Sequence, residues 1–195
     1  MRDMAKRLKS YIQFFWAGVK DHTQTGAIVP SQRILVDKMI APIPVDYCGQ
    51  VLELGAGNGA LTLRLAQTRP KARILACEIN PVLARDLRQN LDRAGINGRV
   101  EVVSDAAEEL LSGLAANGRA KPDYIISGIP LCNVGKDETV ALIRQIKSTL
   151  KETGMYIQFQ HSLVDRRKIQ ASFTKLRTVP VLLNFPPAFV YYATK

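Results

Sequence analysis

A run of glycines directly after an apolar segment is the first feature of the chain that predicts chemistry. Residues 51–60 read Val-Leu-Glu-Leu-Gly-Ala-Gly-Asn-Gly-Ala, with glycines at alternate positions, Gly55, Gly57 and Gly59. Glycines between a buried strand and a helix let the backbone turn sharply and approach a ligand closely. The pattern predicts a nucleotide-type cofactor site, and by itself it is typical of both NAD-binding and methyl-donor-binding folds.

Acidic residues accompany the glycines at the ends of three apolar segments. Glu78 ends the second segment, at the position from which a carboxylate accepts hydrogen bonds from ribose hydroxyls. Asp105 ends the third segment, where a carboxylate accepts from the exocyclic amine of an adenine. Glu53 lies inside the glycine motif, where an acid repels a pyrophosphate and suits an ammonium group. The acid at position 53 therefore favours a positively charged ligand.

The elements that must position these residues alternate along the chain from residue 49 onward. Short segments rich in Val, Ile, Leu and Ala predict strands, and the stretches between them have helical spacing. This alternation predicts a doubly wound α/β fold, with a mostly parallel sheet and helices on both faces. The last two strands are expected to form a hairpin-like pair. The expected strands are 50–54, 72–78, 99–103, 122–127, 154–160, 174–183 and 188–194, and the expected helices are 59–68, 81–93 and 136–151.

Two further helices are predicted ahead of the alternating region. Residues 4–19 carry apolar side chains at helical spacing and basic residues elsewhere, which is typical of a basic amphipathic helix that lies on a membrane. A second helix is expected to begin near Ser31. We therefore divide the chain into an N-terminal helical segment, residues 1–40, and one α/β domain, residues 41–195.

The positive charge of the chain is concentrated at its two ends. The formal net charge is +10, of which residues 1–20 contribute +4 and residues 161–195 contribute +5. Ends that meet on one face would attract the phosphates of lipid or nucleic acid, and a solvated basic surface is the alternative. No apolar run reaches the roughly 20 residues that cross a bilayer. Three cysteines without metal-ligand spacing are typical of a reducing cytoplasm, and no metal site is expected.

With three acids in register behind a glycine loop, the sequence resembles the class I S-adenosylmethionine-dependent methyltransferases over residues 49–160. The resemblance implies a Rossmann-like sheet of seven strands and S-adenosylmethionine as the cofactor. It also implies that the loop from Glu53 to Gly59 holds the amino-acid part of the donor. Glu78 is then expected to hold the ribose hydroxyls, and Asp105 the adenine edge.

The fourth expected strand and the C-terminal region carry the information on the methyl acceptor. Methyltransferases that act on planar amines usually have Asn or Asp, then Pro and an aromatic residue, where this chain has Ser127 and Leu131. This segment therefore lacks the polar and aromatic side chains that usually bind a stacked nucleobase. Ser-Gly-Ile-Pro-Leu at 127–131 and Asn-Phe-Pro-Pro-Ala-Phe-Val-Tyr at 184–191 are similar instead to the small bacterial phospholipid N-methyltransferases. That family methylates the amine of phosphatidylethanolamine toward phosphatidylcholine.

The second resemblance implies a catalytic set and a location. Backbone carbonyls around Ser127, Gly128 and Pro130 are expected to orient the amine. His161 or Tyr191 orients it or takes its proton, although His161 stands where the family has an aromatic hydroxyl. The expected partners are a phospholipid substrate and an anionic or amino-phospholipid membrane surface. The expected location is cytoplasmic and peripheral, at the inner membrane surface.

Two other functions stay open at this point. An RNA adenine N6-dimethyltransferase has a similar motif layout, but positions 127 and 131 disagree with it. The chain also ends soon after the final strand, so we expect no appended RNA-binding domain and regard nucleic acid as the less expected partner. A non-catalytic lipid-binding module would not need all three acids. The cluster Arg166–Lys168 is a candidate for a lipid phosphate or a solvated helix face, and the oligomeric state and the lipid head group are left open.

Overall fold

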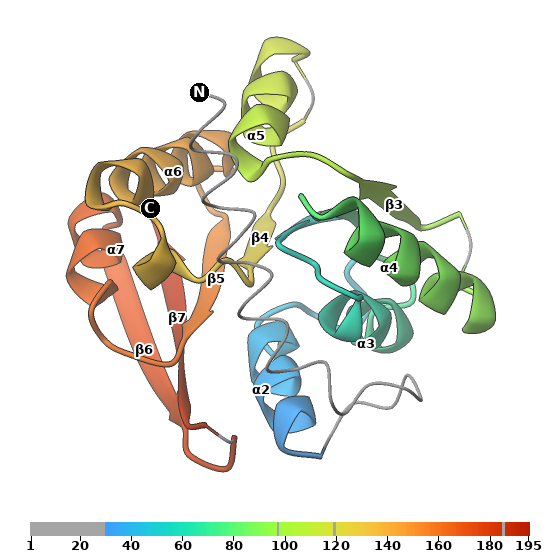
Figure 1. Cartoon of the computed structure of the whole chain (residues 1–195). Helices are drawn as coiled ribbons and strands as arrows, with labels where there is room; N and C mark the ends of the chain where they lie inside the picture. Colours follow the sequence, from blue (N-terminus) through green and yellow to red (C-terminus); the bar gives the residue numbers. More distant parts are fainter. Residues whose placement is uncertain (1–29, 97, 119, 185) are drawn as a thin grey trace.

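A seven-stranded sheet organises the part of the chain that the structure describes. The computed structural model describes residues 30–96, 98–118, 120–184 and 186–195. The strand order is β3-β2-β1-β4-β5-β7-β6, and β7 runs antiparallel to both of its neighbours. Figure 1 shows β3 and β6 at the two ends of this sheet. The strands are β1 (Gln50–Leu54), β2 (Arg73–Cys77), β3 (Val100–Val103), β4 (Tyr124–Ser127), β5 (Met155–Gln160), β6 (Lys175–Val181) and β7 (Ala188–Thr194). The predicted doubly wound, mostly parallel sheet is confirmed, as is the final hairpin-like pair.

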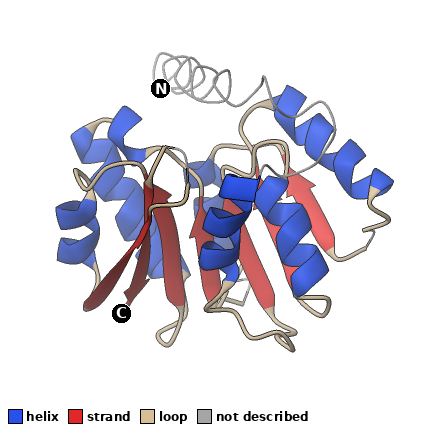
Figure 2. Ribbon diagram, turned by 90° about the horizontal axis from the view of Figure 1, so that it is seen from below, coloured by secondary structure: helices blue, strands red, loops and turns tan. Residues whose placement is uncertain are grey.

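Helices cover both faces of this sheet (Figure 2). They are α2 (Pro30–Ile40), α3 (Ala60–Thr68), α4 (Pro81–Arg93), α5 (Ala107–Ala116), the 3₁₀ turn η2 (Leu131–Asn133), α6 (Lys136–Thr149) and α7 (Arg166–Ser172). One core joins α2, α3 and α4 to one face, and a second core joins α5, α6 and α7 to the other. Because both faces are covered, consecutive residues of β1 are buried on opposite sides, Val51 in the first core and Leu52 in the second.

Most element predictions hold, with two qualifications. The helix expected near Ser31 begins at Pro30, so Ser31 lies in its first turn. The helix α5 was not predicted, because Gly113 interrupts its pattern and its N-cap, Ala106, makes no side-chain capping bond. The amphipathic helix expected at 4–19 lies outside the described residues.

The sheet topology creates a crevice beside the end of β1. Starting from β1 at the middle of the sheet, β2 and β3 follow on one side, and β4 and β5 follow on the other side. Connections that leave a sheet in opposite directions leave an opening outside the carboxyl ends of the strands, where ligands bind in open α/β sheets. The glycine run follows β1 at this edge, and the acids follow β2 and β3.

Candidate active site

The loop after β1 has a backbone that only glycine fits well. The amides of Gly55 and Ala56 both donate to the Cys77 carbonyl, at 2.9 and 3.0 Å, which ties the loop to the end of β2. Gly59 has a φ of 95°, and a Cβ on it would overlap the Cδ1 atom of Leu87 in α4. The loop therefore packs closely against α4 and presents backbone to the crevice, as the glycine spacing predicted.

Glu78 is held in place by backbone groups on both sides. Its carboxylate accepts from the amide of Gly57 at 2.8 Å and from the amide of Asn80 at 2.9 Å. Asn80 in turn caps α4 by accepting from the Val82 amide at 3.0 Å, with Pro81 as the first helical residue. Burial raises the pKa of Glu78, and the two amide bonds oppose that shift. The carboxylate is thus fixed between the glycine loop and the start of α4.

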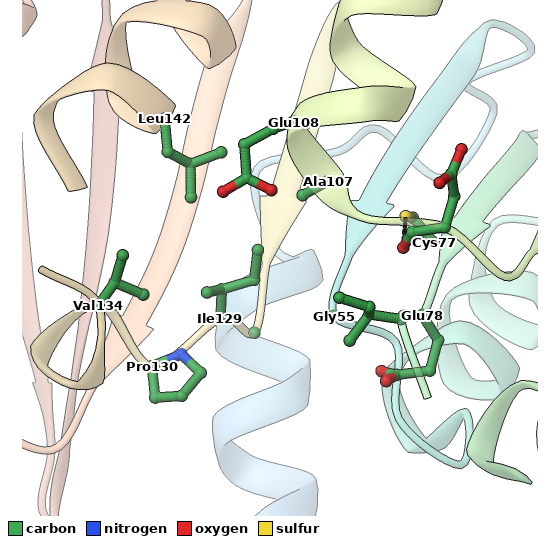
Figure 3. A pocket seen from close by; sticks show the side chains of 12 residues that line it. Gly55, Cys77, Glu78, Ala107, Glu108, Ile129, Pro130, Val134 and Leu142 are labelled. Carbon is green, nitrogen blue, oxygen red and sulfur yellow. Dashed lines mark hydrogen bonds between the residues drawn. The ribbon is translucent and has the colours of Figure 1, made fainter. Parts of the chain in front are cut away.

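A cavity that is partly open to solvent lies along these loops (Figure 3). Among the described residues that line it, the ionisable side chains are the acids Glu78, Asp105 and Glu108 and the thiol of Cys77, without a lysine, arginine or histidine. On a chain of net charge +10, an all-acidic cavity selects for a cationic ligand. The other lining residues are Gly55, Ile79, Ala107, Gly128, Ile129, Pro130, Val134 and Leu142.

The region after β3 places Asp105 on the cavity wall. The Cys77 thiol donates to the Asp105 carbonyl at 3.2 Å, and the Asp105 carboxylate accepts from the Ala106 amide at 2.9 Å. Burial raises the pKa of Cys77 to about 12, so the thiol stays neutral and serves as a donor. A side-chain hydrogen bond to Asp105 and the negative charge of that residue raise the pKa of Glu109. Sequence reasoning missed Glu108 and Glu109 because it missed α5, although two acids in a first turn are a helix-start signal.

Glu53 is buried more deeply than the other predicted ligands and is not part of the cavity lining. Its side chain is 3% exposed, and its carboxyl accepts a hydrogen bond from the Thr62 hydroxyl at 2.8 Å. Burial raises the pKa of Glu53 to about 8, with a smaller contribution from the Glu78 charge, while the Thr62 bond acts in the opposite direction. A carboxyl with this pKa is largely protonated at neutral pH, and a cation beside it would restore its charge.

Among the predicted catalytic residues, Gly128 and Pro130 line the cavity and Ser127 does not. Ser127 is fully buried, and its hydroxyl accepts from the Ile129 amide at 3.2 Å, which shapes the turn after β4. The Ile129 carbonyl accepts from the side-chain amides of Gln158 and Gln160 on β5, both at 3.0 Å. Sequence reasoning missed these two glutamines, because their apolar neighbours on β5 gave only a strand signal. They fix the turn that forms one wall of the cavity.

His161 and Tyr191 lie beyond the cavity lining. Tyr191 is fully buried in the second core, and its hydroxyl donates to the Ser162 carbonyl at 3.1 Å. Burial raises the pKa of Tyr191 to about 12, so that it remains a neutral donor. His161 is exposed, and its Nδ1 donates to the Pro187 carbonyl at 3.0 Å. The structure therefore brings together Gly55, Glu78, Asp105, Gly128 and Pro130. His161 lies on the loop after β5, and Tyr191 lies in β7.

Two classes of feature are absent from the described part of the chain. Within it, no helix is long and apolar enough to span a bilayer. No group of three or more histidine, cysteine, aspartate or glutamate side chains is arranged there to hold a metal ion.

Comparison with known proteins places the chain in a family. The Methyltransferase domain family matches residues 51–154, just over half of the chain. An ornithine lipid N-methyltransferase from Singulisphaera acidiphila is 28% identical over 187 residues, which is 95% of this chain and 96% of that protein. A tRNA1(Val) (adenine(37)-N6)-methyltransferase from Haemophilus influenzae is 29% identical over 93 residues, which is 46% of this chain and 40% of that protein.

Solved structures share the fold at low sequence identity. A SAM-dependent methyltransferase from Agrobacterium tumefaciens superposes with a TM-score of 0.69 at 10% identity, covering 86% of this chain and 63% of that chain. The glycine loop, the ordered acids and the all-acidic cavity coincide with the segment that the family matches. The chain belongs to the Methyltransferase domain family and is an S-adenosylmethionine-dependent methyltransferase.

Proposed function

We propose that the protein methylates the amine of a phospholipid head group, converting phosphatidylethanolamine toward phosphatidylcholine. In this proposal it acts in the cytoplasm, bound peripherally to the inner membrane surface. The observation that carries the proposal is the similarity to an ornithine lipid N-methyltransferase, which extends over 95% of this chain, against 46% for the tRNA methyltransferase. The cavity also favours a lipid amine over a base, because none of the lining residues in the described part of the chain is aromatic.

The donor side of the cavity fits S-adenosylmethionine, which supplies a methyl group on a positively charged sulfur. Glu78 and Asp105 would receive the ribose hydroxyls and the adenine edge, and the glycine loop would lie against the amino-acid part. Glu53 would receive the ammonium group, because a nearby cation strongly stabilises the charged form of a buried carboxyl whose pKa is raised to about 8. The negative lining stabilises the positive charge of such a ligand in a partly desolvated site.

The acceptor side is the apolar end of the same cavity. Figure 3 shows Pro130, Val134 and Leu142 on the side opposite Glu78, with Ile129 between them. Apolar walls exclude water from a bound amine, and orientation of that amine by the rigid Ile129 turn supplies most of the catalysis.

Methyl transfer also requires the amine to lose a proton. We assign the acceptance of this proton to Glu108, whose carboxylate lies on the cavity wall beside Leu142 (Figure 3). Tyr191 is unsuited to this role because its hydroxyl is engaged with Ser162 and its pKa is raised.

Incubation with radiolabelled S-adenosylmethionine tests the proposal directly. The full chain is expected to transfer label to detergent-dispersed phosphatidylethanolamine, with dispersed ornithine lipid and unmodified tRNA as parallel acceptors. Label on the ornithine lipid alone would keep lipid methylation and replace the head group. Label on tRNA alone would overturn the proposal. Calorimetric donor binding without transfer to any acceptor would also overturn it, and would favour a non-catalytic module.

A further inference from the structure

Exposed large apolar side chains are concentrated on two loops near the C-terminus. Of the six strongly exposed large apolar residues in the described part of the chain, four lie on the loop after β5 or the loop between β6 and β7. We call these four the apolar ridge: Leu163 and Val164 on the first loop, 48% and 72% exposed, and Leu182 and Leu183 on the second, 73% and 74% exposed. Isolated exposed apolar residues are ordinary, but a contiguous group marks an interaction surface.

The two ridge loops lie side by side. His161 at the start of the first loop donates to the Pro187 carbonyl on the second at 3.0 Å. The Tyr191 hydroxyl on β7 donates to the Ser162 carbonyl at 3.1 Å. The first bond joins the two loops directly, and the second ties the first loop to β7, the strand that continues from the second loop. We therefore treat the four apolar side chains as one surface.

The ridge stands at the edge of the sheet that holds the cavity. The first loop follows the carboxyl end of β5, and the second joins β6 to β7 at the same edge, because Gln160 pairs with Phe189 and Val181 with Ala188. Gln160, the last residue of β5, also donates to the Ile129 carbonyl at the cavity wall. The ridge therefore flanks the acceptor side of the cavity.

The outward position of the apolar side chains is fixed by buried polar anchors. Asp165 is 1% exposed and pairs with Lys168 at 2.6 Å, and the Leu163 carbonyl accepts from the Arg166 amide at 3.1 Å. In the second loop, Asn184 is 4% exposed and its side chain donates to the Pro186 carbonyl at 2.6 Å. The turns are thus preorganised to present Val164 and the two leucines to the outside.

Basic side chains border the ridge. Arg166, Arg167 and Lys168 follow the first loop directly as the first turn of α7, and Arg167 is exposed. Asp165, the acid of this segment, is buried and neutralised by Lys168. An apolar group bordered by cations matches an anionic lipid surface, where acyl chains meet the former and phosphates the latter.

We propose that the apolar ridge inserts into an anionic lipid bilayer and sets the cavity mouth against the lipid head groups. This inference rests on the proposed lipid substrate, and it adds a second membrane contact to the N-terminal helix expected from the sequence. The ridge brings the acceptor side of the cavity to the head groups, while the donor side, with Glu78 and Asp105, lies farther from the ridge.

Vesicle cosedimentation of the full chain tests the ridge independently of methyl transfer. The probes are vesicles of phosphatidylglycerol and phosphatidylcholine, with pure phosphatidylcholine for comparison. The variant L182S/L183S is expected to lose at least about tenfold in affinity for the anionic vesicles, because two apolar insertions are removed. Val45→Ser is the matched control, since Val45 is 66% exposed before β1, at the opposite edge of the sheet. Leu183→Phe is expected to tighten binding.

The outcomes separate the ridge from the enzymatic proposal. Equal vesicle binding by L182S/L183S and the wild type would overturn the proposal that the ridge inserts into the bilayer, whatever the methylation result. Loss of a solution dimer in L182S/L183S, without a change in vesicle affinity, would assign the ridge to a second copy instead and would also overturn it. Because transfer to detergent-dispersed lipid needs no bilayer, its absence would count against the proposed function and leave a positive vesicle result standing.

Discussion

Replacing Glu53 by glutamine is expected to stabilise the protein without its donor at neutral pH and to weaken donor binding. In the folded chain the Glu53 carboxyl is buried and has a pKa of about 8, against an ordinary value of 4.5. Glutamine keeps an oxygen that can accept from the Thr62 hydroxyl but has no charge to bury. The substitution thus removes the free-energy cost of burying this carboxyl, a cost that the proposed donor binding requires.

The size of this effect depends on pH in a defined direction. Below pH 4.5 the carboxyl is neutral in both the folded and the unfolded chain, so wild type and variant should be equally stable. Between pH 4.5 and about 8 the unfolded chain releases the proton and the folded chain retains it, so the wild type loses stability. The cost is about 1.4 kcal/mol per pH unit, or about 3 kcal/mol at pH 7 and about 5 kcal/mol above pH 8.

Urea unfolding of both proteins at pH 5, 6, 7 and 8, without donor, measures this difference. The free energy of unfolding of Glu53→Gln relative to wild type is expected to grow by about 3 kcal/mol between pH 5 and 7, which is about 6–12 °C in Tm. Glu101→Gln, on the exposed side of β3, is the control, because an exposed carboxylate keeps its hydration in the folded state. A difference for Glu53→Gln that stays flat from pH 5 to 8 would refute the buried-carboxyl account.

Calorimetry with S-adenosylmethionine tests the ligand role of the same residue. If the donor ammonium pairs with Glu53, binding at pH 7 to the wild type releases about one proton, and Glu53→Gln releases none. Removing one partner of a buried charge pair costs about 2–5 kcal/mol, so the variant should bind at least about 30-fold more weakly. Full affinity in the variant, with no proton release in the wild type, would remove Glu53 from the donor site.

Three further substitutions separate the roles of the other site residues. Glu78→Gln should weaken donor binding by about tenfold or more, measured by calorimetry, because the ribose loses a charged acceptor; an unchanged Kd would contradict that role. Glu108→Gln should lower kcat in the lipid assay at least about tenfold while donor affinity is kept, since it removes the proton acceptor; normal turnover would argue for another base. Gly59→Ala should cost more than about 2 kcal/mol in urea unfolding, through positive φ and overlap with Leu87. Gly118→Ala, which has positive φ and no neighbour within 4 Å, should cost about 1 kcal/mol; equal losses would exclude the packing effect.

Local sequence patterns were sufficient to predict that Gly55, Glu78 and Asp105 lie at one edge of the sheet, and their role toward the donor stays a prediction. Glu78 and Asp105 were located because each follows a short apolar strand, and parallel strands place their carboxyl ends at one edge. The acceptor residues depend more on contacts between distant segments. Backbone carbonyls around Ser127, Gly128 and Pro130 were expected to orient the amine; Gly128 and Pro130 line the cavity, and the Ser127 hydroxyl accepts from the Ile129 amide. Tyr191 was expected at the site, but strand alternation turns its side chain into the second core.

The sequence by itself determined the fold class, the glycine loop and the order of the acids, because hydrophobic periodicity and glycine conformation act over a few residues. Only the tertiary structure decided what depends on contacts between distant segments. Packing of α3 against β1 buries Glu53 beside Thr62, and the folding of α5 over the sheet brings Glu108 to the cavity. Pairing of β5 with β7 joins the two ridge loops, whose apolar residues are 18 or more positions apart in the sequence. Burial and charge environment come from these long-range contacts, so no local pattern contains them.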